Sequence, residues 1–235
     1  MKPVALITGA ARGIGRAIAE DLARDHRIAI TWLTATEDAA NFAKTHSDAL
    51  CMQYDLTSAP PQDLIEKVVA HFGQIDVLVN NAGLVGATPL DAYEADDALA
   101  IMQLNALIPL GLIAAATPHM KPGASIVNIT SINTRMPPSD AVAYAASKSA
   151  LETITRGCAK SLGPKGIRVN AVSPGIVERP HAPRLQSVLD QVTDDSALGR
   201  LAEMSDIAAT VRFLASDGAR AITGETLTVS AGYRL

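Results

Sequence analysis

Seven short apolar runs, rich in valine and isoleucine, recur along the 235-residue chain and alternate with longer stretches of helical pattern. They cover residues 4–8, 28–32, 49–55, 77–81, 125–130, 167–173 and 226–230. The stretch after the first run is the clearest helix, with Ile14, Ile18 and Leu22 spaced four residues apart. Strands that alternate with helices predict right-handed βαβ crossovers. We therefore expect an α/β fold, with one domain over residues 1–235 built on a doubly wound, seven-stranded parallel sheet that helices flank on both faces.

Composition narrows the classes of partner. The net charge is -4 with no run of Lys or Arg, so we expect no nucleic-acid partner. No apolar run approaches the length that spans a bilayer, and even residues 106–116 are too short, so we expect no membrane partner. The five histidines lack metal-ligand spacing, so no metal site is predicted. Two distant cysteines and an N-terminus that begins with a strand favour a cytoplasmic protein.

One segment, residues 176–200, breaks the rhythm with a polar stretch that prolines interrupt. Inserts at the carboxyl end of a parallel sheet lie where ligands bind, which predicts a lid over the site. Arg179, His181 and Arg184 in this segment suit an anionic substrate group. They equally suit a solvated loop surface.

The first predicted strand runs into TGAARGIG, residues 8–15, which places Gly9, Gly13 and Gly15 at the start of the first helix. Glycines at such a turn let the backbone approach a pyrophosphate, and the helix N-terminus binds its charge. The spacing departs from the common GxGxxG pattern, and the alternative is a plain strand-to-helix turn. Its place between a strand and a helix favours a dinucleotide site.

The end of the second strand bears on which dinucleotide binds. Leu33 and Thr34 stand where an acidic residue would bind the ribose hydroxyls of NAD. Arg12, inside the glycine turn, suits the 2'-phosphate of NADP, although it also suits an exposed solubilising charge. NADP(H) is therefore favoured, with NAD(H) as the alternative.

A plain helix in the second half of the chain carries one phenol and one ammonium. Tyr144 and Lys148 in AVAYAASKSA, residues 141–150, are four residues apart and so lie on one helix face. Such pairs also occur on ordinary solvated helices. The spacing permits chemistry but does not prove it.

The glycine turn, NNAG (80–83), Asn105, Ser131, the Tyr144 and Lys148 pair and SPG (173–175) occur in an order that resembles the short-chain dehydrogenase/reductase family. The closing residues 198–235 resemble the branch that contains 3-oxoacyl carrier-protein reductases and bacterial sugar and alcohol dehydrogenases. The resemblance implies a Rossmann domain. It also implies hydride transfer between a nicotinamide cofactor and a small carbonyl or secondary alcohol substrate, such as a 3-oxoacyl thioester, a sugar or a ketone.

The resemblance also implies four catalytic residues. Tyr144 exchanges a proton with the substrate oxygen, and Lys148 and the oxidised nicotinamide favour the phenolate, moving the pKa of Tyr144 from near 10 toward neutrality. Lys148 further holds the nicotinamide ribose. Ser131 hydrogen-bonds the substrate oxygen, with a turn-capping serine as the alternative. Asn105 interrupts its helix in this reading, so that a water can link Lys148 to bulk solvent. In the alternative reading, Asn105 is a polar residue that satisfies a bend of the backbone near Pro109.

The cofactor site that the resemblance implies is larger. It comprises Gly9, Arg12, Gly13, Ile14, Gly15, Asp55, Leu56, Asn81, Ala82, Gly83, Tyr144, Lys148, Pro174, Gly175 and Val177. Asp55 contacts the adenine in this reading, or else caps the segment that follows it. Many relatives carry, after SPG, a threonine that touches the carboxamide of the cofactor. This chain has IVERPHAP at residues 176–183, with Glu178 and Arg179 instead, so the lid contacts of relatives do not transfer.

The resemblance implies a homotetramer or homodimer that pairs through helices at about 94–119 and 142–162. The complete set of Ser131, Tyr144 and Lys148 favours an enzyme over a non-catalytic, cofactor-sensing regulator on the same fold. A nucleotide-dependent methyltransferase would not need the Tyr and Lys pair.

Overall fold

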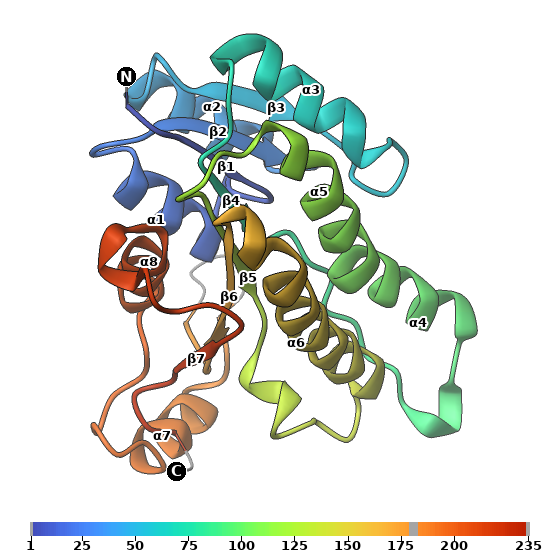
Figure 1. Ribbon diagram of the computed structural model, residues 1–235. Coiled ribbons are helices and arrows are strands. Elements are labelled where there is room, and N and C mark those ends of the chain that lie inside the picture. The colour runs from blue at the N-terminus through green and yellow to red at the C-terminus, as the bar shows by residue number, and fades with distance from the viewer. Residues whose placement is uncertain (1, 179–182, 234–235) are drawn as a thin grey trace.

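The computed structural model describes residues 2–178 and 183–233. Its strands form one seven-stranded sheet in the order β3-β2-β1-β4-β5-β6-β7, with every pair parallel (Figure 1). The strands are β1 (Val4–Ile7), β2 (Arg27–Trp32), β3 (Leu50–Gln53), β4 (Val77–Asn80), β5 (Ser125–Ile129), β6 (Arg168–Pro174) and β7 (Thr226–Val229). The predicted fold class and all seven predicted strands are confirmed.

Helices cover both faces of the sheet (Figure 1). The longer helices are α1 (Gly13–Leu22), α2 (Thr36–Thr45), α3 (Pro61–Phe72), α4 (Ala95–Met102), α5 (Ile108–Ala116), α6 (Val142–Leu162), α7 (Gln186–Asp194) and α8 (Met204–Ala215). A π-helical turn, η2 (Gln103–Leu107), joins α4 to α5. Short 3-10 turns are η1 (Leu90–Ala92), η3 (Thr117–His119), η4 (Ile132–Thr134), η5 (Gly163–Lys165) and η6 (Asp217–Ala219).

Two hydrophobic cores lie on opposite faces of this sheet. On one face α3, α5 and α6 pack over side chains such as Leu6, Leu78 and Ile126. On the other, α1, α2 and α8 pack over the alternate side chains, such as Ile7 and Val79. Every residue of β1, β4, β5 and β6 is buried, which explains why these strands read as continuous apolar runs.

The strand order reverses between β1 and β4, because β2 and β3 continue on one side and β5, β6 and β7 on the other. Loops that leave the carboxyl ends of β1 and β4 therefore diverge, which is where open α/β sheets bind ligands. Ser131 and Gly175 follow the next two strands at the same edge. The topology thus brings the predicted site residues to one edge of the sheet.

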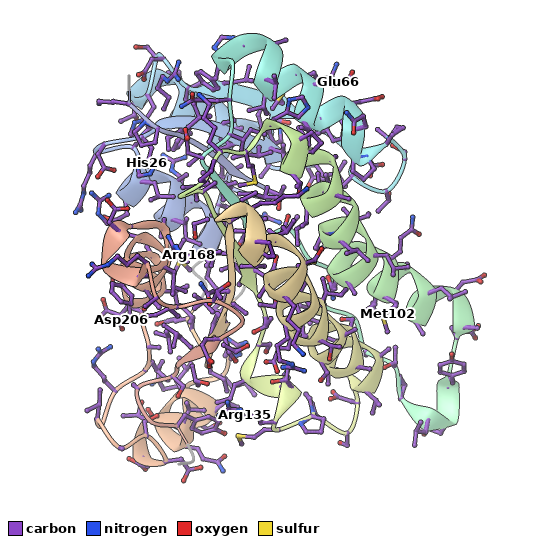
Figure 2. All side chains as sticks on the ribbon, viewed as in Figure 1. His26, Glu66, Met102, Arg135, Arg168 and Asp206 are labelled. Carbon is purple, nitrogen blue, oxygen red and sulfur yellow. The ribbon has the colours of Figure 1, made fainter. Side chains whose placement is uncertain are left out.

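A buried arginine joins β6 to α8. The guanidinium of Arg168 donates hydrogen bonds to the carbonyl oxygens of Leu214 (2.6 Å) and Ser216 (3.2 Å), at the C-terminal end of α8 (Figure 2). Burial lowers the pKa of Arg168 from its ordinary value. The contact satisfies carbonyls that a helix end leaves without intrahelical partners.

The expectation that no segment has the length to span a membrane was wrong. Residues Ala95–His119 form one apolar helix of 25 residues, because the helix continues through the polar η2 turn instead of ending there. Length and composition are weak evidence for a membrane span, since core helices of soluble proteins share them. Leu112, Ile113 and Ala116 of this helix are buried in the core against α3, so it packs as a core helix.

The predicted lid, 176–200, contains a helix that the sequence analysis did not assign. In α7, Leu189 and Val192 are buried. The segment after α7 is tied to the C-terminal residues by an antiparallel bridge between Ser196 and Tyr233 and by a hydrogen bond from Leu198 N to Ala231 O (3.1 Å). Arg179 and His181 lie outside the described residues.

Candidate active site

Two glycines of the turn, Gly9 and Gly15, have no room for a side chain. A Cβ on Gly15 would lie 2.4 Å from Asn81 Nδ2 and 2.7 Å from Gly9 O. Gly9 itself has a φ of +64°, in the left-handed region that favours glycine, and a Cβ there would lie 2.9 Å from Ala82 Cα. The turn after β1 and the loop after β4 are therefore in direct contact.

Two polar side chains fix that contact. Asn81 Nδ2 donates hydrogen bonds to Thr8 O (2.9 Å) and Gly9 O (3.0 Å). In return, Thr8 Oγ1 accepts from the backbone N–H groups of Asn81 and Ala82, both at 3.0 Å. The sequence analysis missed Thr8, although a threonine directly before the first glycine was the available signal.

The N-terminus of α1 opens toward this turn. The first helical residues, Gly13, Ile14 and Gly15, line the cleft described below. Arg12 is the N-cap residue, and its side chain makes no capping hydrogen bond. Since the first N–H groups of a helix have no partners within it, they and the helix dipole suit an anion such as a pyrophosphate.

Among the described residues, one carboxylate lines the cleft. Asp55, after β3, lines the cleft, and its Oδ1 accepts hydrogen bonds from Thr57 N (2.9 Å) and Thr57 Oγ1 (2.6 Å). These bonds hold the pKa of Asp55 below its ordinary value. Asp55 therefore caps the turn that follows it, as the alternative reading held, and also faces the cleft. At the end of β2, Leu33 is 54% exposed and lines the cleft beside Thr34.

Lys148 is almost fully buried on α6, with 4% of its surface exposed. Its Nζ donates a hydrogen bond to Ile129 O (2.8 Å), the last residue of β5. Burial lowers the pKa of Lys148 to about 8. Tyr144, one turn earlier on α6, lines the same cleft.

Ser131 follows β5 and begins the short helix η4. Its Oγ accepts a hydrogen bond from Asn133 N (3.2 Å), so it does cap a turn. Ser131 also lines the cleft with Tyr144 and Lys148. The capping bond uses a lone pair of Ser131 Oγ. The hydroxyl hydrogen of Ser131 is not used by this bond, so Ser131 can cap the turn and also act as a donor.

Asn105 lies on η2 and is fully buried. Its side chain exchanges two hydrogen bonds of 2.8 Å with the backbone N–H and C=O of Leu84, and its Nδ2 also donates to Ser147 Oγ (3.0 Å). Ser147 Oγ in turn donates to Tyr144 O (2.7 Å). Asn105 therefore ties the loop after β4 to α6 and does not itself line the cleft. Pro109, near which the sequence analysis considered a bend, lies in the first turn of α5.

These elements enclose one cleft of about 670 Å³ at the carboxyl edge of the sheet. That volume is in the range of sites that hold cofactors and small ligands, roughly 300–1,000 Å³. Every predicted cofactor residue lines the cleft, as do Ser131, Tyr144 and Lys148: Gly9, Arg12, Gly13, Ile14, Gly15, Asp55, Leu56, Asn81, Ala82, Gly83, Pro174, Gly175 and Val177. Of the predicted site residues, only Asn105 lies outside its wall.

The cleft wall includes further residues that the sequence analysis did not single out. They are Ala11, Thr31, Trp32, Ala35, Tyr54, Thr57, Leu84, Val85, Leu104, Ile129, Thr130, Ile132, Asn133 and Ile176. Most follow the carboxyl end of a strand, and that position is the signal that would have found them. Arg184, considered above as a lid residue, also lines the cleft.

Comparisons with known proteins agree with this geometry. A family model described as enoyl-(acyl carrier protein) reductase matches residues 9–234. An uncharacterised oxidoreductase of Methylorubrum extorquens is 35% identical over 98% of this chain and 97% of its own. A 3-oxoacyl-[acyl-carrier-protein] reductase of Staphylococcus epidermidis is 34% identical over 99% of both chains.

Solved structures agree as well. A short-chain dehydrogenase/reductase of Serratia marcescens superposes with a TM-score of 0.94 at 34% identity, over 99% of this chain and 98% of that one. The chain belongs to the short-chain dehydrogenase/reductase family. A second member of the family, from Burkholderia cenocepacia, was solved in complex with NADP and gives a TM-score of 0.93 at 34% identity, over the same shares of the two chains. The chain is therefore a nicotinamide-dependent oxidoreductase of this family.

Proposed function

We propose that the chain is an NADPH-dependent reductase of carbonyl compounds, which also oxidises the corresponding secondary alcohols. The observation that carries this proposal is the shared cleft: Ser131, Tyr144 and Lys148 line the same wall as the glycine turn. A nicotinamide cofactor held at that turn would extend toward the catalytic residues. The glycines fit the cofactor, because a Cβ at Gly15 would close the cradle.

Three observations support NADP(H) over NAD(H). The sequence at the end of β2 carries Leu33 and Thr34 where an acid would select NAD. Arg12 lies in the cleft wall at the glycine turn, where a guanidinium suits the 2'-phosphate. The Burkholderia cenocepacia relative was solved with NADP, and a blue fluorescent protein from a metagenomic library, 34% identical, was solved with NADPH.

When bound, NADPH supplies the hydride for the carbonyl carbon. The hydroxyl of Tyr144 donates a proton to the carbonyl oxygen, and the buried ammonium of Lys148 stabilises the phenolate that results. Ser131 donates its hydroxyl hydrogen to the same oxygen, while Asn133 N holds the Ser131 Oγ from the other side. The substrate oxygen is thus held by two donors from η4 and α6.

Asn105 supports this arrangement from behind the wall. Its bonds to Leu84 and Ser147 hold the loop after β4 against α6, next to Tyr144. Family resemblance assigns to this position a water that returns protons to the lysine.

Residues 176–200 form the lid in this proposal, and α7 is the part that would lie over the substrate.

The substrate candidates remain a 3-oxoacyl thioester, a sugar and a small ketone. The Staphylococcus epidermidis relative, named as a 3-oxoacyl-[acyl-carrier-protein] reductase, supports the first of them.

The proposal places the protein in the cytoplasm. Cys51 and Cys158 are free and half-buried, which suits a reducing compartment.

The same proposal includes a homotetramer or homodimer. Leu99, Leu107 and Leu110 of the 95–119 helix are exposed, at 65%, 58% and 40%, and suit a contact with a second copy. Light scattering checks the state: a mass near 24.5 kDa at micromolar protein would remove this part of the proposal.

The experiment for the whole proposal is a fluorescence titration with NADPH and with NADH. It is followed by oxidation of the tighter cofactor against a panel of ketones, sugars and acyl thioesters. We expect NADPH to bind more tightly and one carbonyl class to be reduced. Cofactor binding without turnover on any carbonyl would favour the cofactor-sensing regulator, and binding of neither cofactor would overturn the proposal.

A further inference from the structure

Ser131 is held by a short turn at the surface of the molecule. It is the N-cap of η4, which is a single 3-10 turn, and four of the seven residues that follow this turn, 135–141, are exposed. Hydrogen bonds in 3-10 turns have poorer geometry than those in α-helices. The position of Ser131 therefore depends on contacts that η4 makes with other elements.

One such contact comes from α6. Thr134 Oγ1, in η4, donates a hydrogen bond of 2.9 Å to Glu152 Oε1, and both residues are half-buried. Glu152 lies on α6 four residues after Lys148 and eight after Tyr144, so the three side chains follow one side of the helix. The hydrogen bond thus joins the turn that begins at Ser131 to the helix that carries the other two catalytic side chains.

The contact continues from Thr134 to Ser131. Thr134 N donates to Ser131 O (3.1 Å), and Asn133 N, the next donor in the turn, donates to Ser131 Oγ (3.2 Å). A path of hydrogen bonds therefore runs from the carboxylate of Glu152 through Thr134 to Ser131. The buried side chain of Ile132 also holds η4, but apolar packing has no preferred direction, whereas a hydrogen bond has one.

Thr134 and Glu152 both lie outside the described wall of the cleft, so they act behind it. We propose that Glu152 is a positioning residue of the reaction. Through Thr134 it fixes Ser131 relative to Tyr144, so that both hydroxyls meet the same substrate oxygen. Misplacement of a catalytic group by about 1 Å can cost about 10²-fold in rate. This inference rests on the proposed reductase function and adds to it a residue that the sequence analysis did not indicate.

The test uses two pairs of variants. Thr134→Val and Glu152→Leu remove the hydrogen bond, while Thr134→Ser and Glu152→Gln keep a donor and an acceptor at these positions. Thr45→Val is the matched control, because it removes another threonine hydroxyl, which donates to Asn41 O on α2. Each protein is assayed for kcat with NADPH and the best carbonyl compound of the panel. The Kd for NADPH and urea unfolding are measured on the same preparations.

A double-mutant cycle shows whether the hydrogen bond acts through Ser131. Thr134→Val is made in the wild type and in Ser131→Ala, and the slow rate of Ser131→Ala is followed at high enzyme concentration. When one residue acts through another, its loss costs little once the other is gone. A general loosening of the fold would instead lower kcat equally in both backgrounds.

We expect Thr134→Val and Glu152→Leu to lose kcat by about tenfold or more, with the Kd for NADPH within about twofold of the wild type. Thr134→Ser, Glu152→Gln and Thr45→Val should keep kcat within about threefold of the wild type, since the first two retain the hydrogen bond and the third lies far from it. In Ser131→Ala, the further change Thr134→Val should alter kcat by less than about twofold.

Other outcomes overturn the inference and leave the reductase function standing. They are wild-type kcat in both Thr134→Val and Glu152→Leu, an equal loss of kcat in the wild-type and Ser131→Ala backgrounds, and a loss confined to NADPH affinity. A loss in Glu152→Gln as large as that in Glu152→Leu would show that the charge of Glu152, and not its hydrogen bond, matters, which also overturns the inference. Absence of turnover in the wild type would overturn the proposed function and this inference with it.

Discussion

Asn105 and Leu84 exchange two hydrogen bonds, each of 2.8 Å, between the amide of one and the backbone N–H and C=O of the other. Asn105→Ala would leave both backbone groups without these partners next to the buried η2 turn. We expect a loss of stability of about 1 to 3 kcal/mol, since each lost hydrogen bond contributes about 0.5–1.5 kcal/mol. Urea unfolding measures it. Asn41→Ala, an exposed change on α2, is the control, and an equal loss in the two variants would contradict the role of Asn105.

The glycine turn gives a second prediction. Gly15→Ala would place a methyl group 2.4 Å from Asn81 Nδ2, so either the turn or the loop after β4 must shift. We expect the variant to be destabilised by about 1–3 kcal/mol and to bind NADPH more weakly. Gly163→Ala is the matched control, because a Cβ there meets nothing within 4 Å. Wild-type affinity for NADPH in Gly15→Ala would show that the cofactor does not approach this turn.

Arg12 gives a prediction about cofactor selectivity. Arg12→Gln removes the guanidinium from the wall at the glycine turn. We expect the Kd for NADPH to rise about tenfold, which is the loss of one hydrogen bond to a charged group, with the Kd for NADH unchanged. Fluorescence titration of both cofactors measures it, with Arg24→Gln as the control. An equal rise for both cofactors would mean that Arg12 does not contact the 2'-phosphate.

The buried ammonium of Lys148 predicts a pH dependence of stability. Its pKa is about 8 when folded, because burial disfavours the charged form, and about 10.4 when unfolded. Below pH 8 both states are protonated and the folded state carries the cost of the buried charge. As the pH rises from 8 toward 10, the folded state releases its proton first, and its stability increases.

The measurement is urea unfolding of two cofactor-free proteins, one with Lys148 and the other with Lys148→Met, which cannot titrate at this position. Both proteins also carry Tyr144→Phe, which removes the phenol that Lys148 influences, so that the effects of the other titrating groups cancel in the difference. Between pH 7 and pH 10 the protein with Lys148 should gain about 2 to 3 kcal/mol relative to Lys148→Met. A constant difference over that range would show that Lys148 keeps an ordinary pKa.

The strands and the glycine turn could be predicted from the sequence for a physical reason, whereas the other cleft residues were implied by the family resemblance. Strands such as β1 and β5 are buried on both faces, so they appear as unbroken apolar runs. The glycine turn and the loops at Asn81 and Ser131 follow such strands directly, and parallel strands bring their carboxyl ends to one edge.

What the sequence did not predict depends on contacts between distant residues. Two such hydrogen bonds join segments far apart in the chain: Asn81 N donates to Thr8 Oγ1, and Arg168 donates to Leu214 O near the end of α8. Helix α7 was missed for another reason, since its apolar positions Leu185, Val188, Leu189 and Val192 have helical spacing but lie in a stretch that is otherwise polar. A helix at about 94–119 was expected from the family resemblance, but its apolar length was underestimated because Gln103 and Asn105 interrupt the apolar run without ending the helix.

The most direct test of the proposed reductase is turnover by Tyr144→Phe. NADPH oxidation is followed with the best carbonyl compound of the panel, and NADPH affinity is titrated on the same preparations. The account predicts that the wild type turns over and that the variant loses kcat by about 10²–10⁴-fold, the usual contribution of a proton donor, while its Kd for NADPH rises by no more than about tenfold, the loss of one hydrogen bond. Wild-type turnover in Tyr144→Phe would contradict the account.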